Sequence, residues 1–290
     1  MEKHFLVTIS EEKSARYGVK FLKHFFAHKA DIELTLFFVA PKPASRFDGE
    51  SAAEARSRIE RQSLESREKG QRALSATMNE LVVIGFDEKK IHTKLRSGTV
   101  SKISSIAQEA EAGRYDAVVF GKRALSWLES ALKGSLSEEL LDRECSFPVW
   151  ICRKSPDKGR NVLIGVDGSE ASDRMVDHVG YVLSQEERQK AVLCHVKKER
   201  ETEEAAAAVI EKARDILLRN GLQEDRIHSI AVSGADVPKA LLGEAEKGGY
   251  AAVALGRTGT RKRGLRAFLA GSVSEKLFRQ LDQAALWFCY

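Results

Sequence analysis

The sequence YDAVVFG at Tyr115–Gly121 returns as YAAVALG at Tyr250–Gly256, and this repetition decides the fold. Each stretch is a short apolar run that begins with tyrosine and ends with glycine, a pattern typical of a strand buried on both faces of a parallel sheet. The two runs stand 135 positions apart in a chain of 290 residues. Because a repeat of that length exceeds one strand and helix unit, we expect two similar domains.

The repeat extends outward from these strands, and every landmark keeps its order in both copies. The offset between matched residues is 157 near the start of the copies, 135 or 136 in the middle and 137 at the end. The matched stretches are Phe5–Ile9 with Val162–Val166, Ile91-His92 with Ile227-His228, Gly134–Leu140 with Gly271–Leu277, and Trp150–Cys152 with Trp287–Cys289.

The changes of offset locate two differences in length between the copies. The first copy has 21 more residues between Val39 and Ile91, and the second has two more between Gly256 and Gly271. The extra segment of the first copy, about residues 41–70, starts with two prolines and continues into a charged helical pattern. We expect a solvated extension of the second helix there, with a partner-binding arm as the alternative.

Each copy reads as five strands that alternate with helical patterns. In the second copy, Glu203–Arg219 is rich in helix formers and ends at Asn220-Gly221, which is a suitable C-cap. Right-handed crossovers wind such a chain into an open parallel sheet with helices on both faces, so the fold class is α/β. The strands expected in this copy are Val162–Val166, Ala191–Val196, Ile227–Val232, Ala251–Leu255 and Ala285–Phe288.

A polar segment with Pro156 and Gly159 separates the copies. We place a first domain at residues 1–153, a linker at 154–160 and a second domain at 161–290. The last strands, Phe147–Cys152 and Ala284–Cys289, each carry a tryptophan at the same place.

Composition excludes several classes of function. The net charge of +5, from 47 basic and 42 acidic residues, is too small to predict nucleic-acid binding. No apolar stretch approaches the roughly 18 to 20 residues of a membrane-spanning helix, and the start MEKHFLVTIS does not read as a signal peptide. We expect a soluble, cytoplasmic protein. The cysteines form no CxxC pair that would predict a metal site: Cys145, Cys152, Cys194 and Cys289.

Two motifs together carry a resemblance to a known family. The stretch VDGSEAS at Val166–Ser172 puts Asp167 directly after the first strand of the second copy, and Gly256-x-x-Gly259 follows the fourth strand, ahead of a distant Gly-Ser. This pattern resembles the universal stress protein family, whose nucleotide-binding members have an Asp after the first strand and a G-x2-G-x9-G-[S/T] loop. The resemblance covers both copies. It implies two tandem Rossmann-like domains of the adenine-nucleotide α-hydrolase-like kind, acting in stress response or regulation.

The same motifs make physical sense as a nucleotide site. Gly256 ends a strand at the carboxyl edge of a parallel sheet, where ligands of open α/β folds bind. Gly259 would let a phosphate approach the backbone, and Gly271-Ser272 would open a helix whose free N–H groups attract anions. Asp167 suits a ribose hydroxyl or a metal-bound water. By resemblance, the candidate set is Asp167, Gly168, Val196, Gly256, Arg257, Gly259, Gly271, Ser272 and Val273, with Asp167 and Val196 nearer the ribose and base.

The copies differ at these motifs. In the first copy Ser10 takes the position of the acidic residue, and Ala124 replaces the second glycine. We therefore expect at most a weaker first-domain site, at Gly121, Gly134 and Ser135. The longer loop of the second copy is strongly basic and suits a polyphosphate, a solvated surface or an acidic partner. Its cations are Arg257, Arg261, Lys262, Arg263 and Arg266.

The leading hypothesis is a regulatory protein whose second domain binds an adenine nucleotide, with ATP first among them and Mg²⁺ as a candidate companion. The alternative is an interaction module in which both sites have degenerated. In either case the resemblance implies an internal pseudo-dimer through the last strands, with Trp150 and Trp287 at the interface or in separate cores; a further homodimer and an unknown protein partner stay open.

Catalysis is not predicted, because no general base or second carboxylate accompanies Asp167. Weak ATP hydrolysis stays open. Walker-type and dinucleotide-binding glycine motifs are both absent from the sequence. The strand histidines His92, His195 and His228 are expected to be structural.

Overall fold

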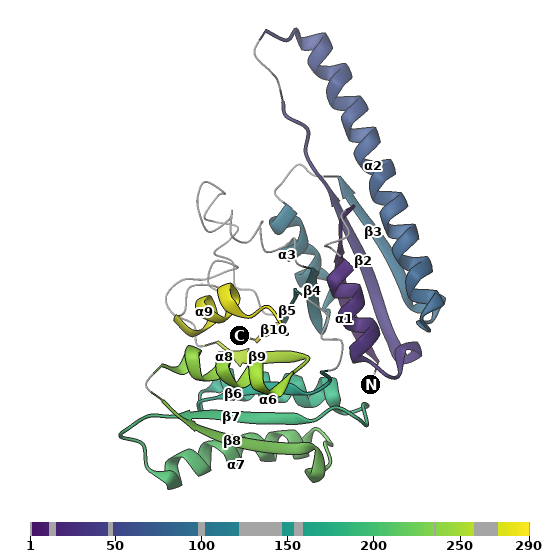
Figure 1. Cartoon of the computed structure of the whole chain (residues 1–290). Helices are drawn as coiled ribbons and strands as arrows, with labels where there is room; N and C mark the ends of the chain where they lie inside the picture. Colours follow the sequence, from purple (N-terminus) through teal and green to yellow (C-terminus); the bar gives the residue numbers. More distant parts are fainter. Residues whose placement is uncertain are drawn as a thin grey trace.

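A single continuous sheet runs through the whole molecule (Figure 1). The computed structural model describes residues 2–11, 16–45, 49–97, 102–121, 147–153, 159–234, 236–257 and 272–289. Within them the strand order is β3-β2-β1-β4-β5-β10-β9-β6-β7-β8. The strands are β1 (Lys3–Ile9), β2 (Ile32–Ala40), β3 (Ile91–Ser97), β4 (Ala117–Gly121), β5 (Val149–Cys152), β6 (Val162–Val166), β7 (Ala191–Lys197), β8 (Ile227–Ser233), β9 (Ala252–Gly256) and β10 (Ala285–Cys289).

The two halves of the sheet repeat one topology, as the sequence repeat predicts. Reading outward from the centre, β5-β4-β1-β2-β3 mirrors β10-β9-β6-β7-β8. Every pairing within a half is parallel, and the β5 to β10 pairing at the centre is antiparallel. The prediction of two tandem parallel α/β domains that form an internal pseudo-dimer is therefore confirmed.

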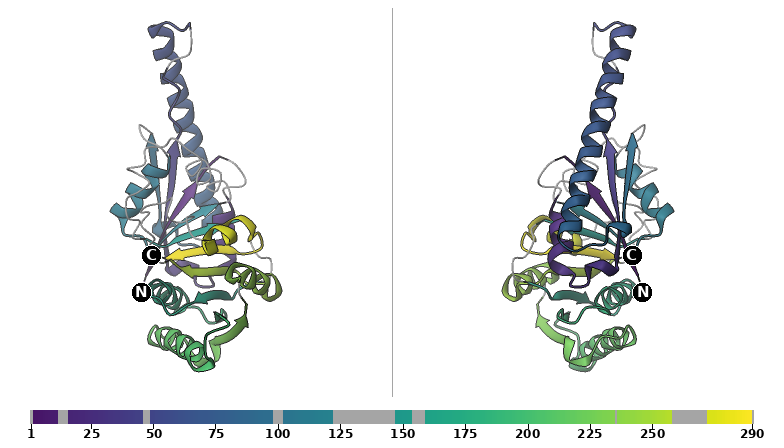
Figure 2. Two further views of the ribbon diagram at one scale, coloured as in Figure 1. Left: turned by 90° about the vertical axis from the view of Figure 1, so that its left-hand side faces the viewer. Right: turned by 90° about the vertical axis from the view of Figure 1, so that its right-hand side faces the viewer.

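Helices cover both faces of this sheet (Figure 2). Alternate residues of a buried strand point to opposite faces, so Phe5 and Val7 of β1 pack on one side and Leu6 on the other. This two-sided burial explains why the inner strands are almost wholly apolar, whereas the edge strands β3 and β8 carry exposed polar residues. The first face carries α1 (Tyr17–Phe25), α2 (Ala52–Val83), α6 (Glu170–Leu183) and α7 (Glu203–Arg219), and the second carries α3 (Lys102–Gly113), α8 (Val237–Gly248) and α9 (Ser272–Gln280).

The extra residues of the first copy lengthen one helix. Helix α2 has 32 residues, whereas its counterpart α7 has 17. Its first turns stand beyond the ends of the neighbouring strands (Figures 1 and 2). A capping box between Ser51 and Glu54 begins the helix, and a salt bridge of 2.7 Å joins Arg58 to Glu50. The projecting part is thus held by local contacts.

Two tryptophans form the centre of the molecule. Trp150 of β5 stands opposite Trp287 of β10 in the antiparallel register. Their rings stack with centroids 3.9 Å apart and planes 5° from parallel, and both side chains are fully buried. Phe21 and Phe25 of α1 surround them. The tryptophans therefore belong to one shared core, not to two separate ones.

The pseudo-symmetry breaks beside these rings. Trp150 donates its indole N–H to Nε2 of His178, on α6, at 3.1 Å. The offset of 157 puts Phe21 at the matching place in the first copy, and a phenyl ring offers no conventional acceptor. Among the described residues, Trp287 Nε1 is buried without a hydrogen-bond partner. The junction therefore holds one satisfied and one unsatisfied indole.

The buried state of His178 makes the junction sensitive to acid. Burial lowers the pKa of His178 to about 4, whereas an unfolded chain titrates histidine near about 6.5. Between those values the unfolded state binds a proton that the folded state does not. The free energy of unfolding should therefore fall as the pH decreases through that window, by up to about 3 kcal/mol.

Urea denaturation of wild type and His178→Phe at about pH 7 and about pH 4.5 measures this contribution, since histidine changes charge between them. The variant carries the residue that the first copy has at this place. It should lose less stability than wild type on acidification. Equal losses would mean that His178 does not resist protonation.

Candidate functional site

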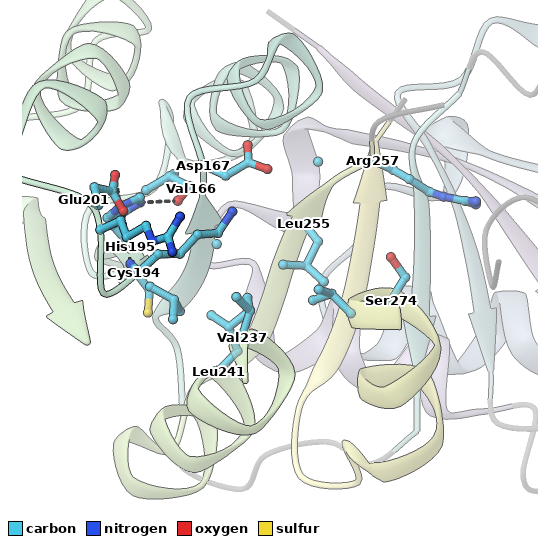
Figure 3. Close-up of a pocket in the computed structure, with 16 residues that line it drawn as sticks. Val166, Asp167, Cys194, His195, Glu201, Val237, Leu241, Leu255, Arg257 and Ser274 are labelled. Atoms are coloured by element: carbon cyan, nitrogen blue, oxygen red, sulfur yellow. Dashed lines mark hydrogen bonds and ion pairs between the residues drawn. The ribbon is translucent and has the colours of Figure 1, made fainter. Parts of the chain in front are cut away.

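A cavity of about 760 Å³ opens at the carboxyl edge of the second half of the sheet (Figure 3). The ends of β6, β7 and β9 border it, together with α8 and the start of α9. Part of its lining is apolar and suits a flat, weakly polar group, and polar and charged side chains make up the rest. The apolar part of the lining, here called the apolar wall, consists of Val166, Val196, Val237, Leu241, Leu255 and Val273.

Asp167 stands at the mouth of this cavity, on the turn from β6 to α6. Its Oδ1 accepts hydrogen bonds from the backbone N–H of Ser169 at 3.0 Å and from the Ser169 hydroxyl at 2.6 Å. Gly168 permits the tight turn with a φ of +79°. Ser169 then caps α6 by accepting from the N–H of Ser172 at 3.2 Å. These contacts fix the exposed carboxylate, and in the described residues no hydrogen bond engages its Oδ2.

Gly256 lines the cavity, and a second requirement explains why it is glycine. A Cβ at Gly256 would lie 2.0 Å from the carbonyl oxygen of Ala171 and 2.3 Å from the backbone nitrogen of Ser172. The absent side chain therefore lets the first turn of α6 pack directly on the end of β9. Gly256 belongs to the nucleotide site expected from the sequence, and its packing role is a finding of the structure.

Residues around the second half of the predicted loop are only partly described. Helix α9 begins at Ser272, and Val273 and Ser274 of its first turn line the cavity. Arg257 also lines it and is almost fully buried. In Figure 3 its side chain extends away from Asp167. The predicted glycines Gly259 and Gly271 lie outside the described residues.

The structure brings together polar residues that the sequence argument did not assign to the site. His195, dismissed as structural, borders the cavity together with Lys198, Arg200 and Glu201. All four occupy the end of β7 or the connection that follows it. The predicted strand order could have indicated these residues, because β7 neighbours β6 in a parallel sheet and the carboxyl ends of both strands lie at the same edge.

His195 is held from two sides. Its Nδ1 lies 2.8 Å from the carbonyl oxygen of Val166, and its Nε2 lies 2.9 Å from Oε1 of Glu201. The other oxygen of Glu201 accepts from the backbone N–H of Lys198 at 3.2 Å. The N–H of Lys198 and the hydrogen bond with His195 lower the pKa of the Glu201 carboxyl. Cys194 stays a thiol, because burial raises its pKa to about 12.

The corresponding edge of the first half is built differently. Gly121 ends β4 as predicted, and Ser10 follows β1 with its hydroxyl buried and without a hydrogen-bond partner in the described residues. Thr8 stands where the second copy has Gly165, which lines the cavity. Its hydroxyl donates to the carbonyl of Val119 at 3.2 Å. Gly134 and Ser135 lie outside the described residues.

The described residues contain neither a cluster of metal-ligating side chains nor a helix suited to a membrane. No group of three His, Cys, Asp or Glu side chains there is arranged to hold a metal ion. No helix there combines the length and the hydropathy needed to cross a membrane.

Comparisons with known proteins agree with this architecture. A solved universal stress protein from Archaeoglobus fulgidus DSM 4304 superposes with a TM-score of 0.70 at 18% identity, covering 100% of this chain and 98% of that one. A protein of unknown function from Pseudomonas aeruginosa PAO1 gives 0.59 at 16% identity, over 99% and 92% of the two chains. A putative universal stress protein from Pseudomonas aeruginosa UCBPP-PA14 gives 0.58 at 16% identity, with the same coverage.

At these identities the solved structures support the fold alone. No curated protein matches the sequence significantly. The family model for the universal stress protein family matches residues 1–153 and again residues 159–286. The chain therefore belongs to the universal stress protein family, with two tandem domains of that kind.

Proposed function

We propose that the second domain binds an adenine nucleotide, with ATP as the first candidate, and that binding serves regulation in stress response. The observation that carries this proposal is the cavity at the carboxyl edge of β6, β7 and β9. It combines an apolar wall with a fixed carboxylate and the start of a helix. A planar base, a ribose and a phosphate chain require these three kinds of surface.

Each part of the ligand has a candidate partner. Asp167 offers Oδ2 to a ribose hydroxyl, and Val196 lies on the apolar wall that suits the base. The first turn of α9, from Ser272, would offer the N–H groups of a helix start to phosphate oxygens. Lys198 and Arg200 add positive charge at the rim. Family resemblance adds Gly256, Gly259 and Gly271 to the phosphate side, with Gly168 and Arg257 nearby.

Mg²⁺ is part of this proposal only as a companion of the phosphates. The ion keeps several of its own waters and usually binds through one or two carboxylates plus phosphate oxygens. Asp167 fits that role, because it is exposed at the mouth of the cavity. The ion would then neutralise phosphate charge.

Helix α6 provides a physical route from this site to the first domain. It begins at the Asp167 turn, and its far end contacts the other half of the molecule. Tyr181 donates to Asp116 at 3.2 Å, and just beyond the helix Glu186 accepts from the backbone N–H of Ala27 at 3.0 Å. A ligand that shifts the start of α6 would therefore act on the contacts between the domains. This favours a role in setting conformation or partner choice.

Two measurements test the proposal. Mass spectrometry after denaturing freshly purified protein should identify a released adenine nucleotide, and calorimetry should detect ATP binding. The Asp167→Ala variant should bind ATP about tenfold more weakly or worse, the size expected for losing one hydrogen bond to a charged group. Glu170→Ala is the matched control, since Glu170 is an exposed carboxylate three residues away that does not line the cavity.

The outcomes separate the competing functions. An absence of released nucleotide together with no heat of ATP binding would reject the proposal and favour an interaction module built on the paired sheets. Equal affinities of wild type and Asp167→Ala would reject only the site assignment. Binding that is lost on changing Gly121 instead would move the site to the first domain.

A further inference from the structure

His195 occupies a position between two acceptors at the edge of the cavity. The side chain is 5% exposed. The carbonyl of Val166 faces Nδ1, and the carboxylate of Glu201 faces Nε2 (Figure 3). A carbonyl oxygen can only accept a hydrogen bond, and an ionised carboxylate likewise only accepts. Each of these two contacts is therefore a hydrogen bond only if the ring nitrogen in it carries a proton.

A neutral imidazole cannot satisfy both contacts, because it carries one N–H and one lone pair. The pKa of Glu201 is lowered by its hydrogen bonds, so its carboxylate is the ionised partner. With a neutral ring protonated at Nδ1, the lone pair of Nε2 would face that negative charge. Only the imidazolium form makes both hydrogen bonds together.

The ring joins two connections that border the cavity. Val166 immediately precedes Asp167, so the contact at Nδ1 fixes the strand end from which the Asp167 turn departs. On the other side, Glu201 accepts from the N–H of Lys198, and Lys198 and Arg200 both line the cavity. The Glu201 side chain is therefore one of the contacts that hold the connection carrying these two cations, beside the backbone hydrogen bond from the N–H of Glu201 to the carbonyl of Lys198.

The first copy lacks this arrangement. The offset of 157 puts Phe38 at the place of His195, and Phe38 is buried with no polar atom in its side chain. The connection after that strand is also longer in the first copy: β2 ends at Ala40 and α2 begins at Ala52, whereas β7 ends at Lys197 and α7 begins at Glu203. The short β7–α7 connection held by His195 is therefore found in the second copy and not in the first.

The charge of the His195 imidazolium favours anion binding in addition to its role in holding the two connections. A bare Glu201 carboxylate beside the cavity would repel a phosphate, and the imidazolium neutralises it. The neighbouring Cys194 thiol is uncharged, as its raised pKa requires. The charged side chains that line the same cavity as His195 are Asp167, Lys198, Arg200, Glu201 and Arg257.

We propose that His195, as an imidazolium, is a positioning residue of the second-domain site: it ties the β6 end to the β7–α7 connection and makes anionic ligand binding depend on its own charge. This inference rests on the proposed nucleotide function for its effect on affinity. The bridge itself requires no ligand, so it can be tested separately.

The first experiment examines the ligand-free protein. Nitrogen-15 NMR of the histidine side chains at neutral pH should show His195 protonated at both ring nitrogens. Hydrogen exchange should show a protected Lys198 amide, and Glu201→Ala should remove that protection. A singly protonated His195 ring, or a Lys198 amide that exchanges equally in both proteins, overturns the inference whether or not ATP binds.

The second experiment measures ATP affinity against pH. Wild type should bind about tenfold more weakly once the imidazolium is deprotonated, the size of one charge-assisted hydrogen bond. His195→Gln keeps a donor that cannot titrate, so its affinity should change much less with pH, whereas His195→Phe should bind weakly at every pH. His228→Gln is the control, because His228 is exposed on the adjacent strand β8 and does not line the cavity.

The two proposals fail in different ways. If wild type does not bind ATP, the nucleotide function is rejected, while the NMR and exchange results still decide the bridge. If wild type binds ATP with a pH dependence equal to that of His195→Gln, the positioning role is rejected and the nucleotide function stands.

Discussion

The Trp287→Ala variant is expected to lose about 3 to 5 kcal/mol of the free energy of unfolding, the range for truncating a large buried aromatic side chain. Trp287 is fully buried and stacks on Trp150 at a centroid distance of 3.9 Å. Its removal leaves a cavity at the only place where the two halves of the described sheet are joined by strand pairing. Urea denaturation followed by far-ultraviolet circular dichroism measures the loss.

Replacing each tryptophan by phenylalanine supplies a sharper comparison. Trp150→Phe removes the donor to His178 and leaves a buried acceptor unpaired, which costs about 1 to 3 kcal/mol. Trp287→Phe removes an indole N–H that has no partner in the described residues, and this offsets part of its lost packing. We therefore expect Trp287→Phe to be the milder change. The opposite order would show that the junction does not have the asymmetry described.

The second large effect is expected for Gly256→Ala, which should cost about 3 kcal/mol or more, at the upper end for overpacking. The new Cβ would lie 2.0 Å from the Ala171 carbonyl oxygen and 2.2 Å from its carbon. These are backbone atoms in the first turn of α6, so no side-chain rotation relieves the contact. The helix must move away from β9. Because Asp167 stands on the turn before α6, ATP affinity should fall as well.

Gly243→Ala is the matched control for this variant. Gly243 lies inside α8, and a Cβ there would meet nothing within 4 Å. Alanine at a helix interior is favoured over glycine by about 1 kcal/mol, so this change should be neutral or stabilising. Thermal unfolding of both variants separates the cost of close packing from the general effect of removing a glycine. Equal stability of Gly256→Ala and wild type would contradict the packing described.

Much of the fold could be predicted because it depends on local pattern. Short apolar runs between turn residues, such as Val162–Val166 of β6, have the length of a buried strand and are too short for a buried helix. The helix expected at Glu203–Arg219 has those bounds in the structure, since its cap residues and its polar face are local features. The duplication then required the same order of strands in each half. Periodicity and self-similarity are thus sufficient for architecture.

The candidate site was only partly accessible to the same reasoning. Asp167, Gly168 and Gly256 stand in short motifs next to predicted strand ends, so sequence order alone places them at the edge of the sheet. Lys198 and Glu201 stand in no recognisable motif, although Glu201 is only six residues from His195. The contact between His195 and Val166 exists only because β6 and β7 lie side by side. A contact across strands that are 29 residues apart leaves no periodic signal in the chain.

The sequence by itself determined that this protein consists of two α/β domains of one kind, and that the second carries an acidic residue and glycines at the carboxyl edge of its sheet. Only the tertiary structure decided that Trp150 and Trp287 share one core, that Gly256 admits the start of α6, and that His195 lies between Val166 and Glu201. The physical reason is the separation along the chain over which each interaction acts. Burial patterns and caps act between neighbours along the chain, whereas close packing and hydrogen bonding act between groups that folding alone brings together.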